Sequence, residues 1–317
     1  MEIFWILLGV AAVLVIATLL TAYICYRMAF YAAPRKPRDP EAIDVPEGEI
    51  YEVYREKMEK WVRWTRQLPQ EQLTVTSFDG LTLWGTYYEY APGAPIELMF
   101  HGYRGGAERD MSGGVQRCFK LGRSALLVDQ RCSGRSEGNV ITFGIHEHRD
   151  CLSWVDLMVE KFGPDVKIIL TGISMGAATV LMAAGKPLPK NVIGVLADCG
   201  YSSPKAIMKT VIRRMGLPGD LAYPFVRLGA KLYGKFDPDS YSPEEAAKHC
   251  TVPVIFFHGD TDDYVPWEMS KATFDTCASR KKLVITPGAG HGLCYPVAPQ
   301  EYLQALAEFF GPEASAK

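Results

Sequence analysis

The hydrophobic pattern of the chain begins with a long apolar run and changes sharply after it. No charged residue occurs from Ile3 to Tyr26. As a helix this run measures about 36 Å at about 1.5 Å per residue, more than the roughly 30 Å hydrocarbon core of a bilayer. Basic residues follow the run at positions 27, 35, 36 and 38, and none precedes it. We therefore expect residues 1–27 to be a single-pass transmembrane anchor, with the C-terminal side in the cytoplasm.

A cleaved signal peptide is the alternative for this segment. Signal peptides carry basic residues before a shorter apolar region and end at a small-residue cleavage site. Here the only charge before the run is Glu2, and no A-x-A site follows. These features favour the uncleaved anchor.

Residues 28–70 combine a predicted linker with a predicted helix. The stretch 32–48 is rich in proline and charge, which is typical of a stiff linker. From 49 to 68 apolar residues recur at a spacing of three or four, which indicates one face of a helix: Ile50, Val53, Tyr54, Met58, Trp61, Trp64 and Leu68. Such a helix either lies in a membrane interface or packs on a globular domain. The mixture of acidic and basic residues on its polar side favours packing.

From residue 71 onward, short apolar runs alternate with helical patterns. Two β-rich runs flank Phe78-Asp79-Gly80, a hairpin turn signal. Apolar runs separated by helices are typical of a mostly parallel sheet with helices on both faces. We expect strands at 96–100, 125–129, 167–172, 192–198, 253–259 and 281–285, and helices near 110–121, 146–162, from 175, and 298–310.

Residues 201–250 interrupt this alternation. They contain two helix-like stretches, 203–216 and 221–234, that are rich in Tyr, Phe, Met and Leu. We expect this insertion to be a helical cap above a site in the domain formed by residues 71–317.

Composition narrows the function classes. The 317 residues are 48% hydrophobic with a net charge of −2, and no basic stripe with interleaved aromatics occurs, so no nucleic-acid partner is expected. None of the eight cysteines forms a C-x-x-C pair, which disfavours a zinc ribbon or a redox site. We expect them to be reduced and mostly buried. No metal and no organic cofactor are expected.

The stretch LTGISMGAAT places Ser174 between two glycines just after a predicted strand. A serine at a strained strand-to-helix turn is a candidate nucleophile, since Gly172 and Gly176 make room for the turn. The same pattern also occurs where small residues permit close helix packing. A nucleophilic serine needs a base, usually histidine, and a carboxylate that orients the base.

His291 is the best candidate for the base, because it lies in the glycine-rich loop TPGAGHGLCY after a predicted strand. His101 and His258 each directly precede a glycine at a strand end, and His249 lies in the insertion. His146 and His148 resemble a fragment of an H-x-H-x-D metal motif that no neighbouring histidine completes. The carboxylate candidates follow the strand 253–259: Asp260, Asp262 and Asp263.

Acyl transfer also needs hydrogen-bond donors for the oxyanion. One is the backbone N–H of Met175, directly after the candidate nucleophile and at a helix N-terminus. The other is expected from the loop HGYRGG after the strand 96–100, and the N–H of Tyr103 is our choice.

These motifs together resemble the α/β-hydrolase superfamily. The residues that carry the resemblance are HGYRGG, DQRCSGRSEG, GISMGAA, ADCGYSS, HGDTDDYVP and GAGHG, in the expected order over residues 73–310. The resemblance is closest to serine hydrolases of the prolyl-oligopeptidase and acyl-esterase group, including membrane-anchored bacterial members. It implies the α/β-hydrolase fold, Ser174 as nucleophile and His291 as base.

The family pattern D-x-x-V-P matches residues 262–266 and selects Asp262 as the acid, with Asp263 as its variable neighbour. One departure is Cys132, which stands where the family usually has a glycine. Because that loop is structural in the family, the departure concerns local geometry rather than chemistry.

The sequence thus predicts a membrane-tethered serine hydrolase acting on acyl, aryl or lysolipid esters. The substrate pocket is expected under residues 201–250, with Tyr201, Trp267 and Tyr295 as possible lining residues. Two alternatives remain. One is a peptidase of the prolyl-oligopeptidase type, but nothing in the sequence resembles the N-terminal propeller domain of those enzymes. The other is a non-catalytic membrane scaffold with a hydrolase fold, which would have no reason to keep the serine, histidine, aspartate and oxyanion loop together.

Overall fold

A mostly parallel eight-stranded sheet forms the centre of the protein. The computed structural model describes residues 1–33, 39 and 41–311. The strands are β1 (Glu71–Thr76), β2 (Thr82–Tyr88), β3 (Ile96–Phe100), β4 (Ser124–Asp129), β5 (Ile168–Ile173), β6 (Val192–Asp198), β7 (Val254–Gly259) and β8 (Lys281–Thr286). Their order is β1-β2-β4-β3-β5-β6-β7-β8. The β1–β2 and β2–β4 pairs are antiparallel, and the others are parallel.

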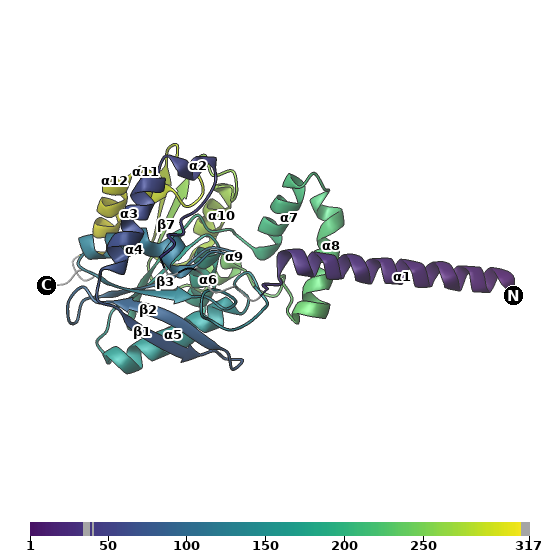
Figure 1. Ribbon diagram of the computed structural model, residues 1–317, viewed down its shortest axis with the longest axis horizontal. Helices are drawn as coiled ribbons and strands as arrows, with labels where there is room; N and C mark the ends of the chain where they lie inside the picture. Colours follow the sequence, from purple (N-terminus) through teal and green to yellow (C-terminus); the bar gives the residue numbers. More distant parts are fainter. Residues whose placement is uncertain (34–38, 40, 312–317) are drawn as a thin grey trace.

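Helices cover both faces of this sheet (Figure 1). Those after residue 100 and outside residues 201–234 are α4 (Ala107–Lys120), α5 (Glu147–Phe162), α6 (Met175–Ala184), α9 (Pro243–Ala247, in the last part of the insertion), α10 (Glu268–Thr276), α11 (Cys294–Val297) and α12 (Pro299–Phe310). Adjacent strand residues face opposite cores: Leu170 packs with α5 and α6, whereas Ile169 packs with α12. This arrangement confirms the predicted fold class.

The amphipathic pattern before the sheet forms two short helices that pack on the domain. They are α2 (Glu49–Glu52) and α3 (Arg55–Arg66). Met58, Trp61 and Val62 of α3 are buried, and the Trp61 ring stacks on Tyr295 with a centroid separation of 5.4 Å. The packed alternative is therefore confirmed. Six residues of the predicted linker, 34–38 and 40, lie outside the described residues.

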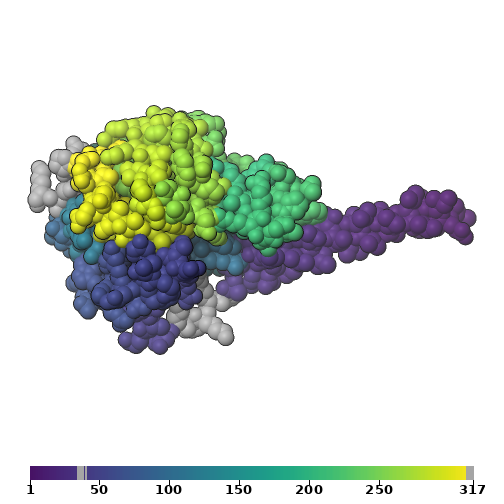
Figure 2. Space-filling model, turned by 90° about the horizontal axis from the view of Figure 1, so that it is seen from above, coloured from purple at the N-terminus to yellow at the C-terminus, as the bar shows by residue number. Residues whose placement is uncertain are grey.

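The N-terminal apolar run forms α1 (Glu2–Ala29), which projects from the body as a rod (Figures 1 and 2). Among the described residues, it is the one helix with enough length and apolar composition to cross a bilayer. A secretion signal near an N-terminus shares both properties.

The insertion lies at the base of this rod (Figure 2). Its two predicted helices form α7 (Pro204–Arg214), α8 (Gly219–Gly229) and a π-helical extension, η1 (Ala230–Gly234). They bury one stripe of α1 together with the residue that follows it, including Ala22, Tyr26 and Phe30. The C-terminal third of α1 is therefore part of the folded body and not a free tether.

Candidate active site

Ser174 lies on a sharp turn between β5 and α6. Its φ of 56° is in the left-handed region, which costs energy for any residue with a side chain. A Cβ at Gly172 would lie 2.1 Å from the carbonyl oxygen of Gly176, and one at Gly176 would lie 1.9 Å from that of Phe100. Both flanking positions therefore require glycine, as the motif indicates.

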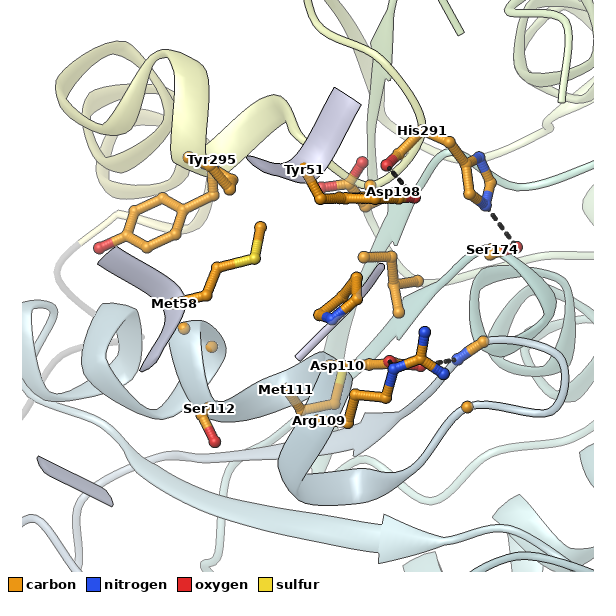
Figure 3. A pocket seen from close by; sticks show the side chains of 18 of the residues that line it. Tyr51, Met58, Arg109, Asp110, Met111, Ser112, Ser174, Asp198, His291 and Tyr295 are labelled. Atoms are coloured by element: carbon orange, nitrogen blue, oxygen red, sulfur yellow. Dashed lines mark hydrogen bonds and ion pairs between the residues drawn. The ribbon is translucent and has the colours of Figure 1, made fainter. Parts of the chain in front are cut away.

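His291 follows β8 and reaches Ser174 from a separate loop. Its Nε2 lies 2.9 Å from Ser174 Oγ, and its Nδ1 lies 2.7 Å from Asp262 Oδ2 (Figure 3 shows the first contact). Because a carboxylate only accepts, Nδ1 carries the proton and Nε2 accepts from the serine hydroxyl. The three side chains form one continuous hydrogen-bonded relay.

Asp262 is the one of the three candidate carboxylates that contacts His291. Its Oδ1 accepts from the backbone N–H groups of Tyr264 and Val265, at 2.9 and 2.8 Å. Burial by itself raises its pKa, but hydrogen bonds from His258 and His291 outweigh burial and hold the pKa of Asp262 well below its ordinary value. Asp262 is thus an ionised acceptor that orients the imidazole.

The other two carboxylates have different surroundings. Asp260 Oδ1 accepts from the backbone N–H of Gly288 at 2.7 Å. Asp263 is exposed and lines the pocket described below.

His258 is a partner of Asp262 that the sequence did not reveal. It is completely buried, and its Nε2 lies 2.8 Å from the carbonyl oxygen of Val265 and 3.2 Å from Asp262 Oδ2. Two acceptors face Nε2, so this nitrogen carries the proton. The sequence feature that could have revealed this contact is that His258 and Asp262 are only four residues apart at the end of β7.

The remaining histidines have structural contacts. Buried His101 accepts from the N–H of Gln130 through Nε2 at 3.1 Å. His146 lies 3.4 Å from the Arg131 guanidinium, and His148 Nδ1 lies 2.8 Å from the carbonyl oxygen of Gly144. His249 is exposed beside Glu245.

The two chosen oxyanion donors belong to two different segments, the start of α6 and the loop after β3. Met175 is the first residue of α6, where backbone N–H groups have no acceptor within the helix and the dipole favours negative charge. Tyr103 lies in the loop after β3 and lines the same pocket as Ser174. Asp110 Oδ2 accepts from the Gly102 N–H at 3.0 Å and holds this loop to α4 (Figure 3).

A pocket of about 620 Å³ opens beside Ser174 and His291. Its walls come from α2 and α3, from α4, and from the loops that follow β3, β5 and β8 (Figure 3). Apolar and aromatic side chains form much of the pocket wall: Ile50, Tyr51, Met58, Trp61, Val62, Met111 and Tyr295.

The location of this pocket differs from the sequence expectation. The cover next to Ser174 is α2 and α3, whereas the insertion 201–250 packs against α1. Tyr295 lines the pocket, but Tyr201 and Trp267 are not among its lining residues. Tyr201 is buried near Phe143 with 2% of its surface exposed, and Trp267 lies at the N-terminus of α10. The apolar residues of the insertion are buried by packing with Tyr26 and Phe30, at and just after the end of α1, rather than by covering the site.

The loop with the departure from the family pattern is held by ion pairs of Arg131. Cys132 has φ of 67°, the left-handed conformation that glycine adopts without strain. Next to it, Arg131 makes a bidentate ion pair with Asp150 and also binds Asp79. Burial raises the pKa of Asp150 to about 6, although Arg131 opposes this shift.

Cys199, Asp262 and His291 bring three potential metal-ligand atoms within 4.8 Å of one another. Ligation requires a thiolate, but burial raises the pKa of the Cys199 thiol well above its ordinary value. Both ring nitrogens of His291 already contact Ser174 and Asp262. The donor set therefore suits proton transfer and not a metal.

Comparison with known proteins identifies the family. The model of the alpha/beta hydrolase family matches residues 98–305, and the chain belongs to this family. The uncharacterized protein YqkD of Bacillus subtilis is 27% identical over 190 residues, which cover 60% of this chain and 62% of YqkD. The mitochondrial palmitoyl-protein thioesterase ABHD10 of Rattus norvegicus is 30% identical over 178 residues, 51% of this chain and 56% of that protein. The match spans less than two thirds of each relative.

Solved esterase structures share the fold. The Pyrococcus furiosus esterase Pf2001 superimposes with a TM-score of 0.64 at 19% identity, covering 85% of this chain and 97% of the esterase. Est1E of Butyrivibrio proteoclasticus, with ferulic acid bound, gives a TM-score of 0.56 at 22% identity and covers 75% and 97%.

Proposed function

We propose that this protein is a serine hydrolase that cleaves carboxylic esters through an acyl-enzyme intermediate. The observation that carries the proposal is the relay Asp262–His291–Ser174 at the wall of the pocket. His291 Nε2 takes the hydroxyl proton as Ser174 Oγ attacks the ester carbonyl carbon. The same proton then passes to the leaving alcohol as the carbon–oxygen bond breaks.

The second half of the reaction uses the same groups. Water gives a proton to His291 Nε2 and attacks the acyl carbon, and the proton returns to Ser174 Oγ as the acid product leaves. Asp262 stays ionised and keeps the imidazole in the required tautomer. The N–H groups of Met175 and Tyr103 stabilise the oxyanion in both steps, and one such donor contributes about 10²- to 10³-fold in turnover.

The proposed substrate class follows from the apolar part of the pocket wall. Its apolar and aromatic side chains suit the acyl or aryl part of an ester, including a lysolipid ester. Because one relative is named a palmitoyl-protein thioesterase, an acyl thioester is the further substrate that we would compare with esters. Peptide bonds and a non-catalytic scaffold role are the remaining alternatives, and no observed feature favours either.

We also propose that α1 anchors the enzyme in a membrane, with the hydrolase domain on the cytoplasmic side. The apolar length of α1 and the basic residues after it support this assignment. Because Ala22 and Tyr26 are buried in the body, activity is best measured on the full chain in detergent or nanodiscs rather than on a fragment that begins at residue 28.

The test is a substrate panel on the full chain. p-Nitrophenyl esters of increasing acyl length, an acyl thioester and aminoacyl-p-nitroanilides are compared for the wild type and Ser174→Ala. We expect turnover of esters that Ser174→Ala abolishes. Anilide hydrolysis in excess of ester hydrolysis would establish a peptidase. Absence of turnover by a folded chain on every substrate would contradict the ester assignment.

A further inference from the structure

The insertion packs closely against the C-terminal part of α1. Thr18, Ala22 and Cys25 lie on the stripe of α1 that is wholly or partly covered, while residues 2–17 are exposed throughout. At the crossing with α8, a Cβ on Gly229 would lie 2.3 Å from the carbonyl oxygen of Ala22, so the two backbones are in close contact. Tyr233 adds a hydrogen bond to the carbonyl oxygen of Leu19 at 3.3 Å.

The free part of α1 is too short to cross a bilayer core alone. Residues 2–17 span about 24 Å at about 1.5 Å per residue, whereas the hydrocarbon core is about 30 Å thick. A hydrocarbon core that begins at residue 2 therefore extends about 6 Å beyond residue 17, to the level where α8 and η1 cross α1. Figure 1 shows α8 standing across α1 at that level.

The insertion exposes apolar side chains where it crosses α1 and along the turn that connects α7 and α8. Leu221 is 72% exposed, and the others are between 36% and 54% exposed: Met215, Leu217, Leu232 and Tyr233. Leu221 and Leu232 are eleven positions apart, the spacing that puts residues on one side of a helix after three turns. Exposed apolar patches mark interaction surfaces, and beside a helix of membrane length the apolar material that this patch would contact is lipid.

We propose that α8, η1 and the turn between α7 and α8 lie in the membrane interface and act as an in-plane lipid-docking platform around α1. This inference rests on the proposal that α1 crosses the bilayer, and it is independent of the chemistry at Ser174. Tyr23 and Tyr233 pack edge to face at the crossing, with centroids 5.2 Å apart, where interfacial aromatic residues belong.

Charged groups around the platform fit the headgroup level. Exposed basic residues flank the apolar positions on both sides, with Arg213 and Arg214 before the turn and Lys231 and Lys235 in and after η1. Two of these cations have acidic partners: Arg213 lies 3.5 Å from Asp220, which also pairs with Lys209, and Lys231 lies 3.3 Å from Asp237. An apolar stripe bordered by cations is the composition of an interfacial helix.

Arg214, the last residue of α7 and next to the platform, lies near the rim of the pocket. The Arg214 guanidinium lies 5.6 Å from the ring centroid of Tyr264, and that ring lies 5.1 Å from the ring of His291. Tyr264 lines the pocket. Docking α7 and α8 at the lipid surface therefore holds one rim of the pocket in a fixed position relative to the bilayer.

The test measures the depth of single labels in the full chain. Leu221→Cys and Leu232→Cys are labelled with the environment-sensitive dye NBD, with the unsubstituted chain as labelling blank. The proteins are placed one copy per nanodisc of phosphatidylcholine and phosphatidylglycerol, which excludes a second copy as the cover. Val10→Cys reports the middle of the exposed part of α1, and Asp156→Cys, at an exposed position of α5, reports water. Lipids with a spin label near the headgroup or near the chain end act as quenchers.

We expect blue-shifted emission at 221 and 232, and quenching mainly by the shallow spin label. Val10→Cys should be quenched mainly by the deep label, and Asp156→Cys by neither. If 221 and 232 behave like Asp156→Cys while Val10→Cys is quenched, the platform inference is wrong and the anchor stands. If Val10→Cys is also unquenched, the anchor proposal itself fails. Thermal unfolding checks that each labelled variant is folded.

Discussion

The phenol of Tyr51 donates a hydrogen bond to the backbone carbonyl oxygen of His291 at 3.0 Å, across 240 positions of sequence (Figure 3). The neighbouring Ile50 closes on the same loop, because a Cβ at Gly290 would lie 3.2 Å from its Cδ1. Helix α2, which precedes the sheet in the chain, therefore covers the pocket and steadies the loop that carries the candidate base.

Tyr51→Phe should lower kcat/KM for the best ester by about 3- to 10-fold, because a net hydrogen bond is worth about 0.5–1.5 kcal/mol. Burial raises the pKa of Tyr51, so the phenol remains a donor throughout the neutral range. Tyr54→Phe, just outside the pocket lining, is the matched control and should leave kcat/KM unchanged. Equal effects of the two substitutions would show that Tyr51 has no positioning role.

Asp262→Asn should reduce kcat by about 10⁴-fold, since an amide stabilises the wrong imidazole tautomer. Asp263→Asn, at the adjacent exposed position, should retain nearly full activity. Steady-state rates of both variants on the same ester decide the matter. The reverse order of effects would reassign the acid.

Gly229→Ala should destabilise the protein by about 1–3 kcal/mol, the usual cost of forcing an extra group into a packed contact. The added Cβ would meet the backbone of Ala22. Gly9→Ala on the free part of α1 is the control, because nothing lies within 4 Å of a Cβ there. Unfolding of both variants in the same detergent provides the comparison. An unaffected Gly229→Ala would indicate that α1 and α8 separate easily.

Glu97→Gln should destabilise by about 3–5 kcal/mol, because it leaves the buried guanidiniums of Arg117 and Arg123 without their shared carboxylate. Exposed Glu89→Gln is the control. Burial raises the pKa of Glu97, but the two arginines outweigh burial and lower it to about 2. Because the folded pKa is below the ordinary value of about 4.3, the contribution is complete above about pH 5 and is lost as pH falls toward 2. Stability curves of the wild type and Glu97→Gln should therefore converge in that acid range.

The parts predictable from sequence are those coded by neighbouring residues. The strands follow from continuous apolar runs, and the turn at Ser174 follows from two glycines whose added side chains would collide with backbone. His291 and Asp262 follow strand ends, and parallel strands bring their carboxyl ends to one edge of the sheet. Local pattern and topology thus suffice to bring this trio together.

The parts that were missed depend on distant pairings. The aromatic insertion has the same composition whether it covers a pocket or packs on α1, and only the contact of Gly229 with Ala22 decides this. The pocket wall from α2 depends on Tyr51 and His291 meeting across most of the chain. Glu97 lies inside an apolar run, and nothing near it in the sequence indicates that Arg117 and Arg123 pair with its carboxylate.

The most direct measurement of the central claim is the site of covalent labelling by a fluorophosphonate. The full chain is treated in detergent, digested, and analysed by peptide mass spectrometry. The paired variants are Ser174→Ala and Ser202→Ala, the second at a buried serine that does not line the pocket. An adduct on Ser174, absent from Ser174→Ala and retained in Ser202→Ala, is the result we predict. A folded wild-type chain that carries no adduct, or carries it on another residue, would contradict the proposed serine hydrolase.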